Sequence, residues 1–273
     1  MELAEIHCYP VKSLRGHALK TATVEPIGLK GDRRWLVVDA SGRFRTIREL
    51  PKMVQIEVEA TPLGIRMIHG EAGSCTVDAP HEGTDECDIT IWRDTVRAAA
   101  AGRDADVFLS RVLGTKVRLV YLADPRGRPL GAKSGAAKDH VNFADDFPVL
   151  LTSRSSLADL CKRAGADIAM RRFRPNLVIA GAAPWEEDRW RAIRIGTVRF
   201  RVGAPCERCV ITTRDPDTGE QIDPYEPLRT LMRFHRARNG SAIFGQNLIP
   251  DNPGTVSIGD TVEVLSAGAS NVL

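Results

Sequence analysis

The sequence predicts a mainly β protein with a few helices, an α+β fold in two linked units. Short stretches in which valine, isoleucine and threonine alternate with other residues recur along much of the chain, and turn residues separate them. Two stretches carry helix signals instead. At 273 residues the chain can bury one large core or two ordinary ones without disulfide bonds, and we favour two units.

The first part of the chain is expected to be a mainly β unit with at least one helix. Val107, Phe108 and Val112 recur at helical spacing and Gly114 follows, which predicts a helix over 104–113 before an apolar run at 117–122. The strands expected before this helix are 19–25, 34–39, 53–60, 64–69 and 88–92.

The boundary between the units is expected close to residues 124–137, which are rich in proline, glycine and small residues and form a linker or a long loop. We therefore divide the chain into 1–123 and 124–273. In the second unit, a capping-box pattern starting at Ser156 and a glycine at Gly165 predict a helix over 156–163. The remaining segments suit a small barrel or closed sheet, with strand or hairpin signals at 176–180, 192–202 (turn at Gly196) and 255–265 (turn at Gly259).

Composition excludes several classes of protein. The chain has 38 basic and 35 acidic side chains, a formal charge of +3, so no strong overall field points to nucleic acid or a membrane as partner. Six scattered cysteines do not suit a secreted disulfide scaffold. No signal-peptide pattern or bilayer-spanning apolar stretch is present in the sequence, and we expect a soluble, cytoplasmic protein.

The pair Cys206 and Cys209, with Arg208 between them, is the most informative short motif. A guanidinium favours the thiolate, which is both the nucleophilic and the metal-binding form of cysteine. Zinc would need a second cysteine pair or suitably spaced histidines, which the sequence lacks. A thioredoxin-like pair would begin a helix, whereas residues 210–213 are expected to form a strand. Two buried structural cysteines are the remaining alternative.

Two basic segments suit an anion. Residues 171–176 carry three arginines before a proline and an asparagine, and a planar guanidinium can donate two parallel hydrogen bonds to a phosphate. Asn176 could pair with the edge of a heterocycle. Lys12, Ser13 and Arg33 lie at loop-to-strand junctions where they could hold the same anion. The alternative in each case is a solvated basic turn.

Taken together and in this order, the motifs closely resemble the MOSC family, named from the C-terminal domain of molybdenum cofactor sulfurase, and within it the amidoxime-reducing branch. The resemblance covers nearly the whole chain. The motifs that carry it are Tyr-Pro-Val-Lys-Ser at 9–13, Gly-Asp-Arg-Arg-Trp at 31–35, Phe-Ala-Asp at 143–145, Ser-Ser-Leu-Ala-Asp-Leu at 155–160, Phe-Arg-Pro-Asn at 173–176, 208–219, Phe-Gly-Gln-Asn at 244–247 and Asn-Pro-Gly at 252–254.

The resemblance implies an N-terminal β-barrel-like domain packed on a MOSC β-barrel domain, with a molybdenum pterin cofactor in the cleft between them. It matches Cys209, rather than Cys206, to the cysteine that ligates molybdenum. The positions that it matches to cofactor-binding residues are Lys12, Ser13, Arg33, Asp145, Arg174, Asn176 and Glu207. Glu207 departs from the family, whose members often have a small hydroxyl residue there, and a carboxylate near a phosphate is unfavourable unless it turns away or pairs with Arg208.

The function that the resemblance implies is a molybdenum cofactor-dependent oxidoreductase that reduces small N-hydroxylated compounds, such as amidoximes and hydroxylamines, to amines, a detoxification chemistry. Cys209 and Asp145 would act in catalysis, Asp145 as a candidate for proton delivery. Electrons would come from a separate donor protein of the ferredoxin, cytochrome or flavin reductase type. The alternative is a non-catalytic protein that carries the cofactor or sulfur on Cys209.

Overall fold

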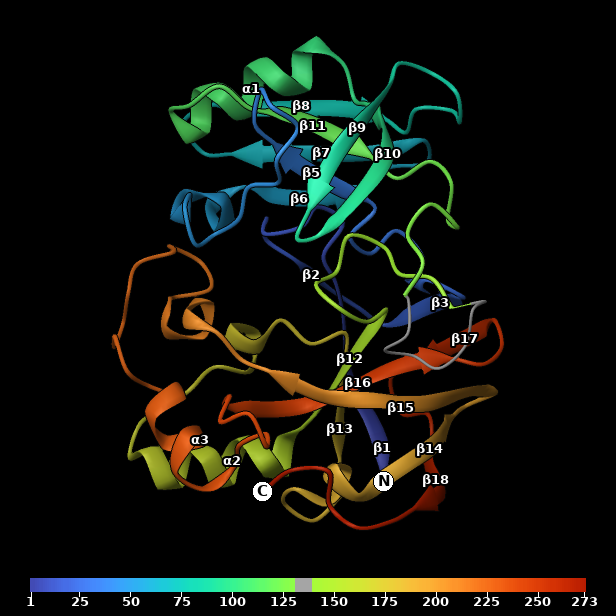
Figure 1. Cartoon of the computed structure of the whole chain (residues 1–273), viewed down its shortest axis with the longest axis vertical. Helices are drawn as coiled ribbons and strands as arrows, with labels where there is room; N and C mark the ends of the chain where they lie inside the picture. The colour runs from blue at the N-terminus through green and yellow to red at the C-terminus, as the bar shows by residue number, and fades with distance from the viewer. Residues whose placement is uncertain (131–138) are drawn as a thin grey trace.

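The computed structural model describes residues 1–130 and 139–273 and has a mainly β fold, with three α-helices in this part of the chain (Figure 1). The strands form four sheets, one of eight strands, one of four and two of three. The predicted fold class is therefore confirmed. The described part of the chain has no helix long and apolar enough to cross a membrane.

The eight-stranded sheet joins both ends of the chain. Its strand order is β18 (Val262–Ala267), β14 (Trp190–Ile195), β15 (Val198–Glu207), β16 (Ile243–Pro250), β12 (Val149–Ser153), β13 (Leu177–Ala180), β1 (Glu2–Cys8) and β2 (His17–Leu19). The sheet curls round on itself, because Glu2 forms a bridge with Thr261 and the Val262 N–H donates to the Met1 carbonyl at 3.0 Å. Apolar side chains that include Leu3, Ile6 and Trp190 fill its interior.

Two helices and a small sheet flank the eight-stranded sheet. The helices are α2 (Arg154–Ala164) and α3 (Leu228–Phe234), which pack over a cluster that includes Leu160, Phe173 and Phe244. The small sheet consists of β17 (Gly254–Ser257), β3 (Thr21–Glu25) and β4 (Gly28–Leu29).

The rest of the N-terminal half forms the upper part of the molecule in Figure 1. One of its sheets is β5 (Trp35–Val38), β11 (Arg118–Tyr121), β10 (Asp94–Ala100) and β9 (Glu86–Ile91), and the other is β6 (Glu57–Ala60), β7 (Gly64–His69) and β8 (Gly73–Asp78). Helix α1 (Arg103–Leu113) packs against them with Phe108 and Leu109, and it ends at Gly114, which has the left-handed φ of 68°. The predicted helix and its glycine stop are both present.

Strands from the two halves of the sequence are hydrogen-bonded to one another. Strands β1 and β2 belong to the sheet of β12–β16, and β3 pairs with β17 along residues 21–24. The ends of the upper part meet, since the Leu122 N–H donates to the Arg34 carbonyl at 2.9 Å. The division into 1–123 and 124–273 stays a prediction; its expected linker lies partly outside the described residues.

Several local expectations were wrong. Residues 210–213 form a 3₁₀ helix, η5 (Val210–Thr213), because the Thr212 and Thr213 hydroxyls donate to the carbonyls of Cys209 and Val210. Residues 53–55 lie in another 3₁₀ turn, η1 (Pro51–Gln55), because Pro51 is its first residue and its fixed φ suits the start of a helical turn. Helix α2 starts before Ser156, whose oxygen accepts the Trp185 N–H instead of capping the helix.

The two strand signals at 192–202 and 255–265 have different outcomes. Strands β14 and β15 form the expected antiparallel hairpin around Gly196. Strands β17 and β18 do not pair with each other, because β17 joins β3 and β18 joins β14. The turn at Gly259 therefore carries the chain from one sheet to another.

Candidate active site

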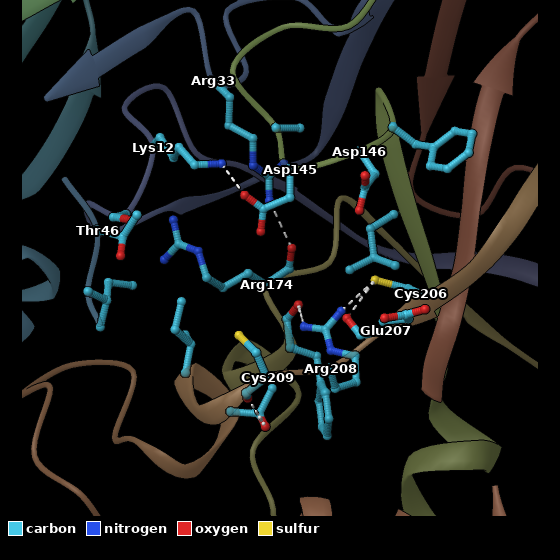
Figure 2. A pocket seen from close by; sticks show the side chains of 18 of the residues that line it. Lys12, Arg33, Thr46, Asp145, Asp146, Arg174, Cys206, Glu207, Arg208 and Cys209 are labelled. Carbon is cyan, nitrogen blue, oxygen red and sulfur yellow. Dashed lines mark hydrogen bonds and ion pairs between the residues drawn. The ribbon is translucent and has the colours of Figure 1, made fainter. Parts of the chain in front are cut away.

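A cavity between the upper part and the eight-stranded sheet contains all the residues predicted for the site. Its unfilled space is about 940 Å³, part of it open to solvent. The predicted residues that line it are Lys12, Ser13, Arg33, Asp145, Arg174, Asn176, Glu207 and Cys209. Figure 2 labels all of them except Ser13 and Asn176.

Lys12 and Asp145 form an ion pair across the cavity. The Lys12 ammonium donates to Asp145 and to the Phe143 carbonyl, the latter at 2.8 Å. Burial lowers the pKa of Lys12, and the Asp145 charge opposes this. About half of the Asp145 side chain is accessible, and the protein atoms around the rest would raise its pKa. The Lys12 charge outweighs this and lowers the pKa of Asp145 well below its ordinary value. Asp145 is therefore a carboxylate at neutral pH.

Arg33 is fixed by three groups in the cavity wall. Its Nη1 donates to Asp32 at 2.6 Å and to the Asn176 side-chain oxygen at 3.0 Å, and its Nη2 donates to the Arg174 carbonyl at 3.1 Å. Burial would lower the pKa of Arg33, but the fully buried Asp32 carboxylate raises it. Asn176 uses its oxygen for Arg33 and for the Leu150 N–H, so it positions the wall rather than offering this oxygen to a heterocycle.

Three residues of the cavity have left-handed backbones although they are not glycine. Ser13, Arg33 and Arg174 have φ values of 71°, 47° and 54°. This conformation costs free energy for residues with a Cβ and recurs at functional sites. Burial lowers the pKa of Arg174 to about 10, and the neighbouring Arg33 charge lowers it too. The fold thus holds several cations close together at one side of the cavity.

The two cysteines of the motif have different surroundings. The Cys206 sulfur accepts a hydrogen bond from Arg208 Nη1 at 2.8 Å, and Arg208 Nη2 donates to the Phe173 carbonyl at 2.6 Å. In Figure 2 the two sulfurs lie on either side of Arg208. We expected this guanidinium to favour a thiolate, but at Cys206 burial outweighs it and raises the thiol pKa.

Cys209 contacts an arginine from the upper part of the molecule. Arg48 Nη2 donates to the Cys209 sulfur at 3.2 Å, and its guanidinium lies 5.0 Å from the ring centre of Trp92. The Trp92 indole N–H in turn donates to Asp145 at 3.2 Å. Arg48 and Trp92 were not predicted. The local signal for Arg48 is Thr46-x-x-Glu49, whose side chains hydrogen-bond at 2.6 Å and fix the turn that carries it.

Glu207 turns away from the cations. Its Oε1 accepts the side-chain N–H of Asn239 at 2.9 Å, and its side chain is exposed at the edge of the cavity. Arg208 makes its hydrogen bonds elsewhere, to Cys206 and Phe173. On the sequence alone, a carboxylate is acceptable here if it turns away from a bound phosphate or pairs with Arg208. The structure shows that it turns away.

The cavity has the chemistry that a molybdenum pterin cofactor needs. Its inner side has buried cations for a phosphate, and Cys209 offers one soft sulfur ligand. Arg208 Nε is buried and has no hydrogen-bond partner within the described residues, so it can donate to a bound group. The residues of the cavity therefore fit a molybdenum pterin cofactor.

Comparison with known proteins agrees with the fold. The model of the MOSC N-terminal beta barrel domain matches residues 1–116, and that of the MOSC domain matches residues 138–263. Mitochondrial amidoxime-reducing component 1 of Mus musculus is 31% identical, with 96% of this chain and 82% of that protein covered. The protein of the same name from Homo sapiens has the same identity and coverage. A molybdenum cofactor sulfurase from Oryza sativa subsp. japonica is 28% identical over 90% of this chain but only 32% of its own length.

The fold and the two family models therefore define a MOSC protein. Within this class, the chain belongs to the family of the amidoxime-reducing components.

Proposed function

We propose that the protein is a molybdenum cofactor-dependent reductase of N-hydroxylated compounds such as amidoximes and hydroxylamines. The observation that carries the proposal is the convergence of Cys209 with the buried Lys12 and the partly buried Arg33 and Arg174 on one cavity. Relatives that cover nearly the whole chain are named amidoxime-reducing components, which supports oxidoreductase activity.

In this proposal, residues in different parts of the cavity have different roles. Arg33, Arg174 and Ser13 bind the phosphate and pterin, and the Cys209 thiolate binds the metal. When bound, the cofactor supplies two electrons to the N–O bond, and with two protons the N-hydroxylated compound becomes an amine and water. A separate donor protein supplies the electrons.

Proton movement is assigned to the Lys12–Asp145 pair. Asp145 is ionised at neutral pH and so has no proton to donate, while burial makes the Lys12 ammonium a stronger acid than an exposed one. Asp145 therefore orients the Lys12 ammonium, which donates a proton to the bound substrate and regains one from solvent. This changes the predicted catalytic role of Asp145 from proton donor to the group that positions the donor Lys12.

The test is metal analysis of protein made in a host that produces the molybdenum cofactor. We expect near-stoichiometric molybdenum and pterin in the wild type, and more than tenfold lower amidoxime reduction in Cys209→Ala. Cys206→Ala is the matched control, because it removes a thiol from the same cavity, and it should largely retain activity. The reverse ranking contradicts the ligand assignment. Molybdenum without reduction, with several electron donors tried, favours the carrier function.

A further inference from the structure

Helix α3 and the turn that follows it carry positive charge that the site does not use. Residues 228–240 contain four arginines and no acidic residue. All four side chains are exposed: Arg229, Arg233, Arg236 and Arg238. The last three form no ion pair within residues 1–130 and 139–273. Figure 1 shows α3 at the surface of the lower part of the molecule, beside α2.

Most carboxylates on the neighbouring elements have partners other than these three arginines. Asp223 accepts two backbone N–H groups of its own turn, and Glu226 pairs with Arg229 at 2.8 Å. Asp159 of α2 pairs within its own helix. Glu220 is exposed, but its loop leads to the upper part of the molecule, where the Thr218 carbonyl accepts the Gln55 side chain. The arginines after Arg229 therefore lack a counter-charge from these carboxylates.

Exposed apolar side chains come from the elements around these arginines. Four large ones, between 40% and 62% exposed, are Val210, Ile222, Tyr225 and Met232. The elements that carry them are joined: the Ile222 N–H donates to the Thr213 carbonyl at 3.1 Å, and Arg172 donates to the carbonyls of Thr212 and Glu226. Tyrosine, methionine and arginine are enriched at protein–protein interfaces, and grouped exposed apolar side chains mark interaction sites.

This surface adjoins the cavity at Cys209. Cys209 lines the cavity, and the next residue, Val210, is exposed to solvent. The turn after α3 also reaches the cavity edge, because the Asn239 side chain donates to Glu207 at 2.9 Å. A protein bound here would contact the residue that directly follows the proposed metal ligand. We call this surface the α3 face and define it by Val210, Tyr225, Met232, Arg233, Arg236 and Arg238.

We propose that the α3 face is the docking surface for an acidic protein that carries one electron at a time. This inference rests on the proposed reductase function, which needs a separate electron donor. Reduction of one N–O bond takes two electrons and two protons and yields the amine and water, so two reduced carriers dock in turn and each leaves oxidised by one electron. Carboxylates on the carrier supply the counter-charge that Arg233, Arg236 and Arg238 lack, and they steer its approach.

The binding experiment uses the full chain without cofactor and two acidic carriers, a plant-type [2Fe–2S] ferredoxin and a flavodoxin. Calorimetry at low ionic strength should detect a complex that weakens as salt is added. We expect Arg233→Glu combined with Arg236→Glu to weaken it at least about tenfold and to reduce its salt dependence, because two attractive charges become repulsive. Met232→Ser should weaken binding about threefold with an unchanged salt dependence, since it removes apolar contact alone.

The matched control is Arg66→Glu combined with Arg103→Glu. These are exposed arginines on β7 and α1, in the upper part of the molecule (Figure 1). Both double variants change the net charge equally, so the control should bind the carriers like the wild type. The proposal is overturned if the control weakens binding as much, or if neither carrier binds.

Vesicles of phosphatidylserine and phosphatidylcholine test a membrane as the occupant instead. Arginines beside exposed apolar side chains can also contact an anionic bilayer. A wild type that binds these vesicles but neither carrier, together with loss of vesicle binding in Arg233→Glu with Arg236→Glu, would overturn the proposal and make the α3 face a membrane contact. We expect carrier binding and no sedimentation with the vesicles.

Turnover separates failure of docking from failure of the reductase function. Reduced methyl viologen delivers single electrons without a docked protein, so viologen-driven amidoxime reduction should differ by less than about twofold between wild type and Arg233→Glu with Arg236→Glu. With reduced ferredoxin, kcat/KM for the carrier should fall at least about tenfold in this variant. Absence of viologen-driven turnover in the wild type contradicts the reductase function and leaves the binding result intact. Normal viologen-driven turnover without carrier binding contradicts the docking proposal alone.

Discussion

At the scale of single residues, the two cysteines differ in which part of the molecule contacts them. The Cys206 sulfur interacts with Arg208, its neighbour in sequence, while the Cys209 sulfur interacts with Arg48, far away in sequence. Cys209 is therefore the thiol at which the two parts of the molecule meet. Proximity in sequence alone would have assigned Arg208 to both sulfurs.

Arg48 should matter more for turnover than for cofactor retention. It contacts one sulfur, while the cations that would hold the phosphate and pterin lie elsewhere in the cavity. We expect Arg48→Gln to keep more than half of the bound molybdenum and to lower kcat/KM for an amidoxime about tenfold, the effect of one lost charge-assisted hydrogen bond. Molybdenum content and steady-state kinetics measure the two. Arg43→Gln, an exposed arginine of the same loop region, should change neither, and equal losses in both variants would contradict the assignment.

Tyr9 should position two of the cavity's cations. The guanidinium groups of Arg33 and Arg174 lie 4.7 and 4.2 Å from its ring centre, and the Arg33 N–H donates to the Tyr9 carbonyl at 2.8 Å. We expect Tyr9→Leu to lower the free energy of unfolding by about 2–4 kcal/mol, since packing and two cation–π contacts are lost. It should also weaken cofactor retention. Gly16 provides the space for the ring, because a Cβ there would lie 2.3 Å from it.

Two variants identify the cause of the Tyr9 effect. Tyr9→Phe keeps the ring and removes a buried hydroxyl that has no hydrogen-bond partner in the described residues, so it should cost less than about 1 kcal/mol. Tyr121→Leu removes a ring that also lies under a guanidinium, Arg34 at 4.9 Å, but outside the cavity. Urea unfolding should show a loss of stability for Tyr121→Leu with normal molybdenum content. Equal cofactor loss in both leucine variants would reduce Tyr9 to a packing role.

At the scale of elements, the sequence predicts best where partners are close along the chain. The hairpin of β14 and β15 and the glycine stop of α1 depend on neighbouring residues, and both were predicted. Strands β1, β12 and β16 were not, because most of their residues are buried on both faces and show no alternation. Residues 210–213 have β-type composition, but their threonine hydroxyls and the contacts of Cys209 favour a 3₁₀ turn.

The 3₁₀ turn η4 (Glu186–Arg189) should make stability depend on pH. Glu187 is fully buried; burial raises its pKa to about 7, and the adjacent Asp188 charge contributes. The folded state therefore retains a proton that the unfolded state loses at its ordinary pKa of 4.5. Stability should fall as pH rises from about 4.5 through 7, by at most about 3 kcal/mol.

Glu187→Gln should remove this loss, since its neutral amide has nearly the same shape. We expect urea midpoints of the variant and the wild type to be similar at pH 5, and the variant to be more stable by 1–3 kcal/mol at pH 8.5. Glu186→Gln controls for loss of a negative charge in the same turn, because Glu186 is only partly buried. A constant difference between Glu187→Gln and the wild type from pH 5 to 8.5 would rule out titration of Glu187 as the cause.

At the scale of the whole molecule, the site is assembled from segments that only the tertiary fold brings together. The predicted residues come from residues 12–13, 33, 145, 174–176 and 207–209, and all line one cavity. Residue type at loop ends indicated the lysine, arginine and cysteine positions, while Asp145, Glu207 and the choice of Cys209 over Cys206 came from the family resemblance. Arg48 and Trp92 could not be found this way, because their relevance depends on contacts across the two parts of the molecule.

The arrangement of the strands predicts which parts of the chain fold by themselves. Residues 1–33 provide β1 to the middle of the eight-stranded sheet, and Leu3, Ile6 and Val24 to its core. Losing three fully buried apolar side chains would cost about 5–9 kcal/mol, comparable with the whole stability of a domain.

Residues 124–273 alone should therefore unfold without a cooperative urea transition in circular dichroism. A chain in which a short glycine linker joins Arg34 to Leu122, whose backbones are hydrogen-bonded at 2.9 Å, should unfold cooperatively. If both chains unfold cooperatively, β1 is dispensable for folding. If neither does, the upper part is needed as well.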